Sequence, residues 1–86
     1  MPEQKQTALV TGASSGIGRE TALKLAEKGF AVIAAARRKE RLVKLAGQAR
    51  GITPVRVDLS QPEETEKFCD YLAHLPTPVS ILVNNA

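Results

Sequence analysis

The chain has 86 residues, of which 43% are hydrophobic and 24% charged, which is ordinary for a soluble globular protein and leaves room for one domain at most. The net charge of +3 is a mild bias, and an aromatic content of 3% speaks against a base-stacking surface for single-stranded nucleic acid. The longest apolar run, Phe30 to Ala36, is far shorter than the roughly 20 residues of a membrane span, and the polar start lacks the apolar core of a signal peptide. With Cys69 as its single cysteine the chain can form no internal disulfide, and we expect a cytoplasmic protein that binds neither membrane nor nucleic acid.

The first part of the chain predicts a strand, a helix and a second strand. Thr7–Val10 is a short buried strand that leads into a glycine-rich turn. Apolar residues at helical spacing follow from Ile17, and Gly29 is well placed as the glycine that ends this helix. Phe30–Ala35 is continuous and apolar, which is typical of a parallel strand covered on both faces.

A second helix and a third strand come next. Apolar residues recur at i, i+3, i+4 and i+7 from Leu42 to Ala49, with basic residues on the other face. Gly51 is predicted to close this helix. The segment Ile52–Leu59 is predicted to be a strand, since valines alternate within it.

The last predicted elements are a third helix and a fourth strand. Ser60 and Glu63 have the spacing of a capping box, which marks a helix start. Val79–Val83 follows this helix as the fourth strand. The buried stripe predicted for the helix consists of Phe68, Leu72 and Leu75.

The element order βαβαβαβ with short connections predicts an α/β fold, a doubly wound parallel sheet with helices on both faces. Residues 1–86 would form part of one such domain. A sheet that stopped just after Val79–Val83 would leave an apolar strand with an unprotected edge, so we expect the sequence to be the first part of a longer one.

A glycine-rich turn joins the first strand to the first helix, with the spacing Gly12-x-x-x-Gly16-x-Gly18. Glycine lets the backbone turn sharply and lets a pyrophosphate approach the amino end of the helix, where N–H groups and the helix dipole attract it. The flanking strand and helix are the context that a dinucleotide-binding loop requires. A tight turn without a ligand is the alternative, and a P-loop is excluded because no Gly-Lys-Ser/Thr follows.

The end of the second strand indicates which nucleotide binds. Eighteen residues past Gly18 stands Ala36, where a carboxylate would hydrogen-bond a free ribose 2′-hydroxyl. Arg37 and Arg38 follow, and guanidinium groups bind phosphate well, so the pattern favours NADP(H) over NAD(H) and disfavours S-adenosylmethionine. The other basic residues of this cluster are assigned to a solvated helix face: Lys39, Arg41 and Lys44.

Three separate motifs give the chain a resemblance to the short-chain dehydrogenase/reductase family, classical type, from Thr7 onward. Thr11–Gly18 fits the family's TGxxxGxG, Asp58 and Leu59 end the third strand, and the last three residues are similar to the family's Asn-Asn-Ala-Gly. The resemblance implies a Rossmann-type NAD(P)-binding domain. For Asp58 a helix-entry residue beside the capping box is the alternative.

The resemblance implies a contact with the cofactor at each matching position. For the pyrophosphate and the adenosine ribose these are Gly12, Ser14, Ser15, Gly16, Ile17 and Gly18; for the 2′-phosphate, Arg37 and Arg38; for the adenine, Asp58 and Leu59; beside the cofactor ribose, Asn84, Asn85 and Ala86.

The family's catalytic Tyr-x-x-x-Lys pair has no counterpart in this sequence. Tyr71 is followed four residues later by Leu75, and we expect Tyr71 to pack within a helix. His74 is expected to be exposed, and Cys69 to be half-buried and inert. The catalytic pair would lie in a following half, so these residues alone are expected to be inactive.

The resemblance therefore implies the NADP-binding portion of an oxidoreductase that transfers hydride between NADP(H) and a small carbonyl or secondary-alcohol substrate, homo-oligomeric when complete. A stand-alone, non-catalytic nucleotide-binding module is the alternative. A small basic nucleic-acid-binding protein is a third reading, which rests only on the basic cluster from Arg37 to Lys44.

Overall fold

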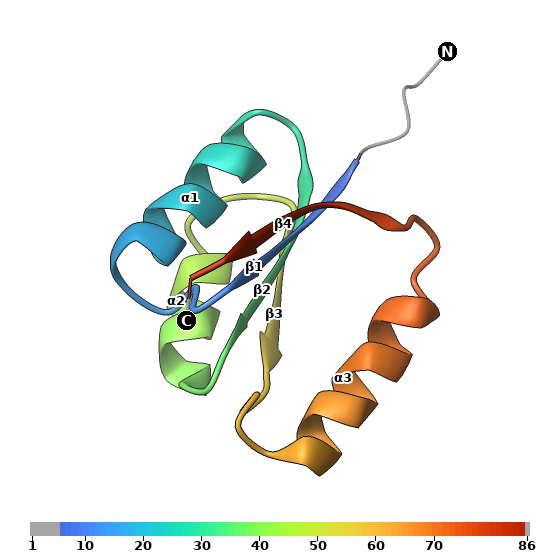
Figure 1. Cartoon of the computed structure of the whole chain (residues 1–86). Coiled ribbons are helices and arrows are strands. Elements are labelled where there is room, and N and C mark those ends of the chain that lie inside the picture. Colours follow the sequence, from blue (N-terminus) through green and yellow to red (C-terminus); the bar gives the residue numbers. More distant parts are fainter. Residues whose placement is uncertain (1–5, 86) are drawn as a thin grey trace.

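The computed structural model describes residues 6–85, which form a single four-stranded sheet and three helices (Figure 1). All strand pairs are parallel, in the order β3-β2-β1-β4, which confirms the predicted doubly wound α/β fold. The elements are β1 (Thr7–Thr11), α1 (Gly16–Glu27), β2 (Ala31–Ala36), α2 (Lys39–Ala46), β3 (Ile52–Arg56), α3 (Pro62–Ala73) and β4 (Val79–Asn84).

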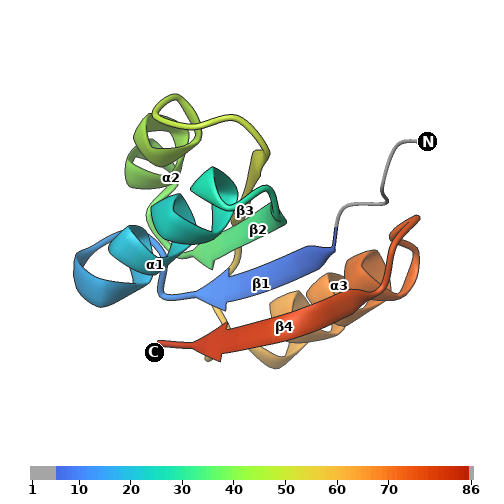
Figure 2. The same ribbon diagram turned by 90° about the horizontal axis from the view of Figure 1, so that it is seen from above.

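The helices cover the two faces of the sheet unequally, with α1 and α2 on one face and α3 on the other (Figure 2). Under α1 and α2 the core includes Val10, Val32 and Leu45, whereas Phe68 of α3 packs with Leu9 and Ile33 on the opposite face. Neighbouring residues of β1 and β2 thus point into different cores. This explains why both strands are apolar without interruption.

The sheet has its switch point between β1 and β4, at the carboxyl ends of the strands. From β1 the chain crosses through α1 to β2 and then through α2 to β3 on the same side, whereas α3 returns it to β4 on the other side of β1. In doubly wound sheets, ligands bind in the crevice that this reversal opens. The residues that follow each strand are therefore the candidates for a ligand-binding site.

On the outer side of β1, strand β4 is the edge of the described sheet. The register shifts between Thr7 and Ala8, which face Val79 and Ile81, so Ser80 is an extra residue in β4. Leu82 has an exposed fraction of 63%, large for a leucine in a strand.

Two predicted boundaries around α2 are wrong. The helix ends at Ala46 with Gly47 as its C-cap, so Ala49 and Gly51 lie beyond it. Glycine is a poor helix former, and the Gly47 N–H bonds to the carbonyl of Val43 as the helix closes. Gly51 has a φ of 86° and instead forms the turn that enters β3.

The capping box predicted at Ser60 and Glu63 is also wrong. The N-cap of α3 is Gln61, without a side-chain cap, and Pro62 opens the helix. The Ser60 hydroxyl donates to Oδ1 of Asp58 at 2.6 Å, a local side-chain contact within the turn before the helix. The same turn ends β3 at Arg56 rather than at the predicted Leu59.

Three side chains considered in the sequence lie on α3 or at its end, namely Cys69, Tyr71 and His74. Cys69 is exposed, which corrects the half-buried position expected for it, because it lies one position around the helix from the buried Phe68. Tyr71 stacks on Phe68 with ring centroids 6.2 Å apart, and His74 is exposed, as expected.

Candidate cofactor-binding site

A cleft of about 590 Å³ opens at the carboxyl ends of the strands. Its walls come from the segments that follow β1, β2 and β3, together with Asn85 after β4. This is the position of the crevice that the sheet order creates. The cleft brings together eight of the predicted site residues, which are Gly12, Ser14, Ser15, Arg37, Arg38, Asp58, Leu59 and Asn85.

The glycine-rich loop needs its glycines for backbone conformation and for space. Gly12 and Gly16 have φ values of 64° and 59°, in the left-handed region that glycine adopts without strain. A Cβ on Gly18 would overlap the carbonyl oxygen of Gly12 and the side-chain amide of Asn85. The N–H of Ala13 donates to the carbonyl of Ala35 at 3.2 Å, so the loop is anchored to β2.

The amino end of α1 is open to an anion. Its N-cap, Ser15, makes no side-chain cap hydrogen bond, and its first turn holds no acidic residue. The N–H groups of Gly16, Ile17 and Gly18 lie in this first turn, where an α-helix offers them no carbonyl partner. Gly16 and Ile17 are exposed, Ile17 with an exposed fraction of 75%, whereas Gly18 is buried, and none of the three lines the cleft.

The wall after β2 is basic. Arg37 and Arg38 are exposed and line the cleft directly after the buried Ala36. Arg41 of α2 lines it as well, which sequence reasoning missed in assigning it to a solvated helix face. Its spacing of three residues from Arg38 was the available signal, because such residues share one side of a helix.

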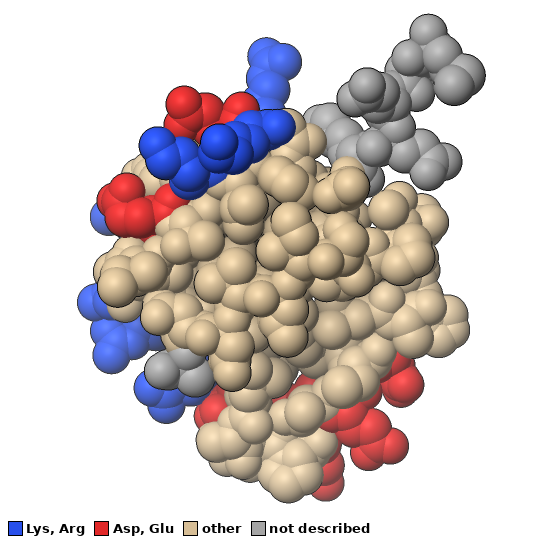
Figure 3. Space-filling model, turned by 45° about the horizontal axis from the view of Figure 1, so that its top comes forward, with Lys and Arg blue, Asp and Glu red and all other residues tan. Residues whose placement is uncertain are grey.

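Charge is distributed unevenly over the surface. Most Lys and Arg atoms in view lie over α1 and α2, on the left in Figure 3, whereas the charged atoms in view over α3 at the lower right are acidic. The cleft borders the basic part, since three of its lining residues are arginines and its lining carboxylate is Asp58.

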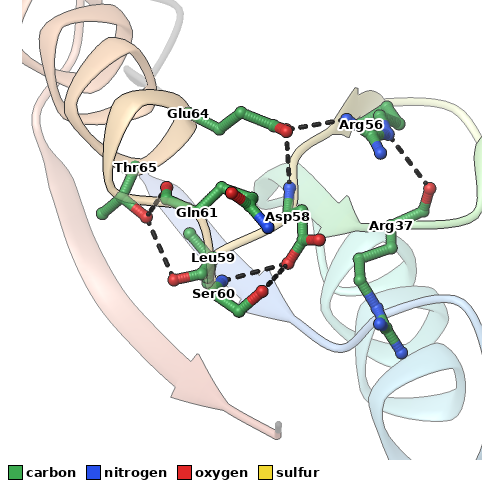
Figure 4. A network of polar contacts seen from close by, with 8 residues as sticks. All are labelled: Arg37, Arg56, Asp58, Leu59, Ser60, Gln61, Glu64 and Thr65. Atoms are coloured by element: carbon green, nitrogen blue, oxygen red, sulfur yellow. Dashed lines mark hydrogen bonds and ion pairs between the residues drawn. The ribbon is translucent and has the colours of Figure 1, made fainter.

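Asp58 forms a compact polar corner where β3 leads into α3 (Figure 4). Its Oδ1 accepts hydrogen bonds from the hydroxyl of Ser60 at 2.6 Å and from the Ser60 N–H at 3.0 Å. These hydrogen bonds, with smaller contributions from the charges of Arg37 and Arg56, hold the pKa of Asp58 below its ordinary value. Asp58 is therefore an ionised acceptor at neutral pH, placed beside Leu59 on the cleft wall.

The end of β4 is tied to the end of β1 through Thr11. The Thr11 hydroxyl donates to Oδ1 of Asn84 at 2.8 Å and accepts from the N–H of Asn85 at 3.2 Å. The side chain of Asn85 donates to the Gly12 carbonyl at 3.4 Å and lines the cleft, whereas that of Asn84 serves the strand pairing. The TGxxxGxG motif contains Thr11 but does not by itself indicate this role, and Ala86 lies outside the described residues.

These groups fit an anionic dinucleotide with a phosphorylated ribose. The open helix end provides backbone donors for a pyrophosphate, and the arginines provide cations for a further phosphate. Ala36 stands where a carboxylate would repel that phosphate. Residues 6–85 contain no cluster of three or more His, Cys, Asp or Glu side chains that could hold a metal ion.

Comparison with known proteins agrees with this geometry. Residues 6–86 match the family described as short chain dehydrogenase. The chain belongs to this family. Within it, the chain is 44% identical over 88 residues to the NADPH-dependent 1-acyldihydroxyacetone phosphate reductase of Saccharomyces cerevisiae. The aligned region covers 98% of this chain and 30% of the yeast protein. It is 46% identical over 79 residues to the L-xylulose reductase of Mus musculus, covering 92% of this chain and 31% of the mouse protein.

A solved structure of the same family is similar throughout. The short-chain dehydrogenase from Sphingobium yanoikuyae in complex with NADPH superposes with a TM-score of 0.86 at 35% identity, covering 94% of this chain and 34% of that one. The chain thus spans about a third of the length of its relatives and corresponds to their N-terminal part. No helix in residues 6–85 has the length and apolar character needed to cross a membrane.

Proposed function

We propose that this chain is the NADP-binding part of an oxidoreductase that transfers hydride between NADP(H) and a carbonyl or secondary-alcohol substrate. The observation that carries the proposal is the end of β2, where Arg37 and Arg38 line the cleft directly after an alanine. An acid at that point would favour NAD(H), whereas guanidinium groups favour a 2′-phosphate. Three similar proteins also support it, because their names include NADPH.

In this proposal each wall of the cleft holds a different part of the cofactor. The amino end of α1 binds the pyrophosphate, Arg37 and Arg38 bind the 2′-phosphate, and Asp58 with Leu59 frames the adenine. Asn85 lies beside the cofactor ribose. The bound NADPH supplies the hydride, and the residues that transfer the proton are assigned to the part of the protein beyond Ala86.

A stand-alone nucleotide-binding module is the second candidate, and the position of Tyr71 is compatible with both candidates. Tyr71 lines a different hollow, with Thr7 at the start of β1 and Thr53 in β3, away from the carboxyl-end cleft. No tyrosine of the described residues can therefore act as an acid beside a cofactor in the cleft. The two candidates differ in whether the full-length protein supplies that acid.

The test is NADPH consumption by the full-length gene product that contains residues 1–86. Carbonyl substrates of several classes (ketoses, 3-oxoacyl thioesters, bulky ketones) are added in turn, with NADPH alone as the control. Substrate-dependent NADPH oxidation is expected, and the class with the highest kcat/KM defines the substrate. Tight NADPH binding, with no NADPH oxidation in the presence of any carbonyl and no NADP⁺ reduction in the presence of any alcohol, would contradict the oxidoreductase and favour the module. We further propose a cytoplasmic homo-oligomer, which subcellular fractionation and light scattering would test.

A further inference from the structure

A polar bridge lies directly behind the proposed 2′-phosphate site, and it consists of Arg56 and Glu64. The Nε–H of Arg56 donates to the backbone carbonyl of Arg37 at 3.2 Å, and its Nη1 donates to Oε1 of Glu64 at 2.7 Å. The same Oε1 accepts the backbone N–H of Asp58 at 3.0 Å. The Arg56 guanidinium and the Glu64 carboxylate thus connect the cleft wall after β2 with the cleft wall after β3 (Figure 4).

The two groups that this bridge holds, the carbonyl of Arg37 and the N–H of Asp58, belong to residues that bind the cofactor in the proposed function. Arg56 and Glu64 themselves do not line the cleft. Arg56 pairs with Ala36 in the sheet, and the N–H of Val57 donates to the Ala36 carbonyl at 2.9 Å. The carbonyls of Ala36 and Arg37 therefore each accept a hydrogen bond from β3 or the residue after it, which holds the backbone at this point. Its side chain points away from Arg56 (Figure 4), which leaves the Arg37 guanidinium available to a ligand.

We propose that Arg56 and Glu64 are positioning residues that fix the backbone of Arg37 and so set the preference for a 2′-phosphorylated dinucleotide. This inference rests on the proposed NADP-binding function. A flexible segment that carries a charged side chain loses conformational entropy when the ligand binds, which weakens binding. A backbone that is already fixed has lost this entropy on folding. Arg56 can hold two acceptors in different directions because its guanidinium is planar and has several donors, which a lysine ammonium on a flexible stem does not reproduce.

Charge and positioning predict opposite results for Glu64→Ala. Removing a negative charge near a phosphate site would by electrostatics alone tighten the binding of NADPH. Positioning predicts weaker binding instead, with the ratio of the NADH and NADPH dissociation constants falling about three- to tenfold, the size expected for partly exposed hydrogen bonds. Glu66→Ala is the matched control, because Glu66 is an exposed residue of the same helix and loses the same charge.

Arg56→Lys is a second variant for which electrostatics and positioning predict different results. The variant keeps the positive charge, so electrostatics predicts no change, whereas positioning predicts a similar fall in the ratio. A merely structural loss would weaken NADPH and NADH equally and leave the ratio unchanged.

The experiment measures both dissociation constants by calorimetry on the full-length protein and on the three variants, with the melting temperature of each. A reduced ratio in Glu64→Ala and Arg56→Lys but not in Glu66→Ala supports the inference. An unchanged ratio in the first two variants overturns it while leaving the proposed function intact. Equal affinity of the unsubstituted protein for NADPH and NADH would instead contradict the proposed function itself.

Discussion

Thr11 and Asn84 are 73 positions apart in the chain, and the Thr11 hydroxyl donates to the Asn84 side chain at 2.8 Å. The same hydroxyl accepts the N–H of Asn85, so one side chain ties together the ends of β1 and β4. These ends meet at the switch point of the sheet, where the cleft opens. The distance between the glycine-rich loop and Asn85 therefore depends on a part-buried contact at the base of the cleft, which Thr11 lines.

Thr11→Val tests this tie. Valine has nearly the shape of threonine, but it would leave Oδ1 of Asn84 and the N–H of Asn85 without this partner. Because unsatisfied polar groups at a part-buried site are costly, we expect a loss of about 1 to 2 kcal/mol in the free energy of unfolding. Urea denaturation of the full-length protein measures it. Thr53→Val, at an exposed position of β3, is the control and should change stability little; equal effects in both variants would refute the role of Thr11.

Gly18→Ala should damage both the fold and the site. The added Cβ would overlap the Gly12 carbonyl and the Asn85 amide, so the loop or the helix must shift. Overpacking of this kind costs about 1 to 3 kcal/mol, and NADPH binding should weaken with it.

Gly47→Ala is the control for this substitution. Gly47 has a φ of −76°, and its added Cβ would meet the nearest atom, the Lys44 carbonyl, at an ordinary 3.5 Å. An alanine there should be neutral or stabilising by up to about 1 kcal/mol. Melting curves of the two variants decide, and a Gly18→Ala protein as stable as Gly47→Ala would contradict the close approach.

The titration of Asp58 provides a pH prediction. Its pKa is lowered from 3.8, chiefly by the hydroxyl of Ser60, so the carboxylate is favoured in the folded state. A depressed carboxyl pKa contributes stability that is present above the unfolded value and is lost as pH falls through the folded value. Ser60→Ala should therefore raise the pKa of Asp58, as measured by NMR titration of its carboxyl carbon. An unchanged pKa would show that the hydroxyl does not stabilise the charge.

The sequence predicts the seven elements and their order because each relies on a local signal. Because β2 is covered on both faces, it is apolar without interruption, and Gly29, with a φ of 96°, follows the C-cap of α1 as predicted for the glycine that ends this helix. The start of α3 is mispredicted because the Ser60 hydroxyl donates to the carboxylate of Asp58 in the turn before the helix, and Gln61 is the N-cap instead. The Ser-to-Glu spacing alone does not show that Asp58 engages this hydroxyl.

The candidate site was predictable where it follows the chain and not where it depends on tertiary packing. Gly12, Arg37 and Asp58 each follow a strand, so parallel topology alone brings them to one edge. Helical spacing places Arg41 on the same side of α2 as Arg38, but whether that side faces the cleft depends on how α2 lies against β2 and β3. The bridge of Arg56 and Glu64 likewise depends on where α3 starts.

The most direct test of this account compares the affinities of the full-length protein for NADPH and NADH, before and after Arg37→Ala. Lys39→Ala removes the same charge from the start of α2 without touching the cleft wall and is the control. A charge-assisted contact with the 2′-phosphate corresponds to a preference of about ten- to hundredfold. We predict that NADPH binds more tightly by this factor, and that Arg37→Ala removes most of the preference while Lys39→Ala retains it. Equal affinities in the unsubstituted protein would contradict the assignment of the basic wall to a 2′-phosphate.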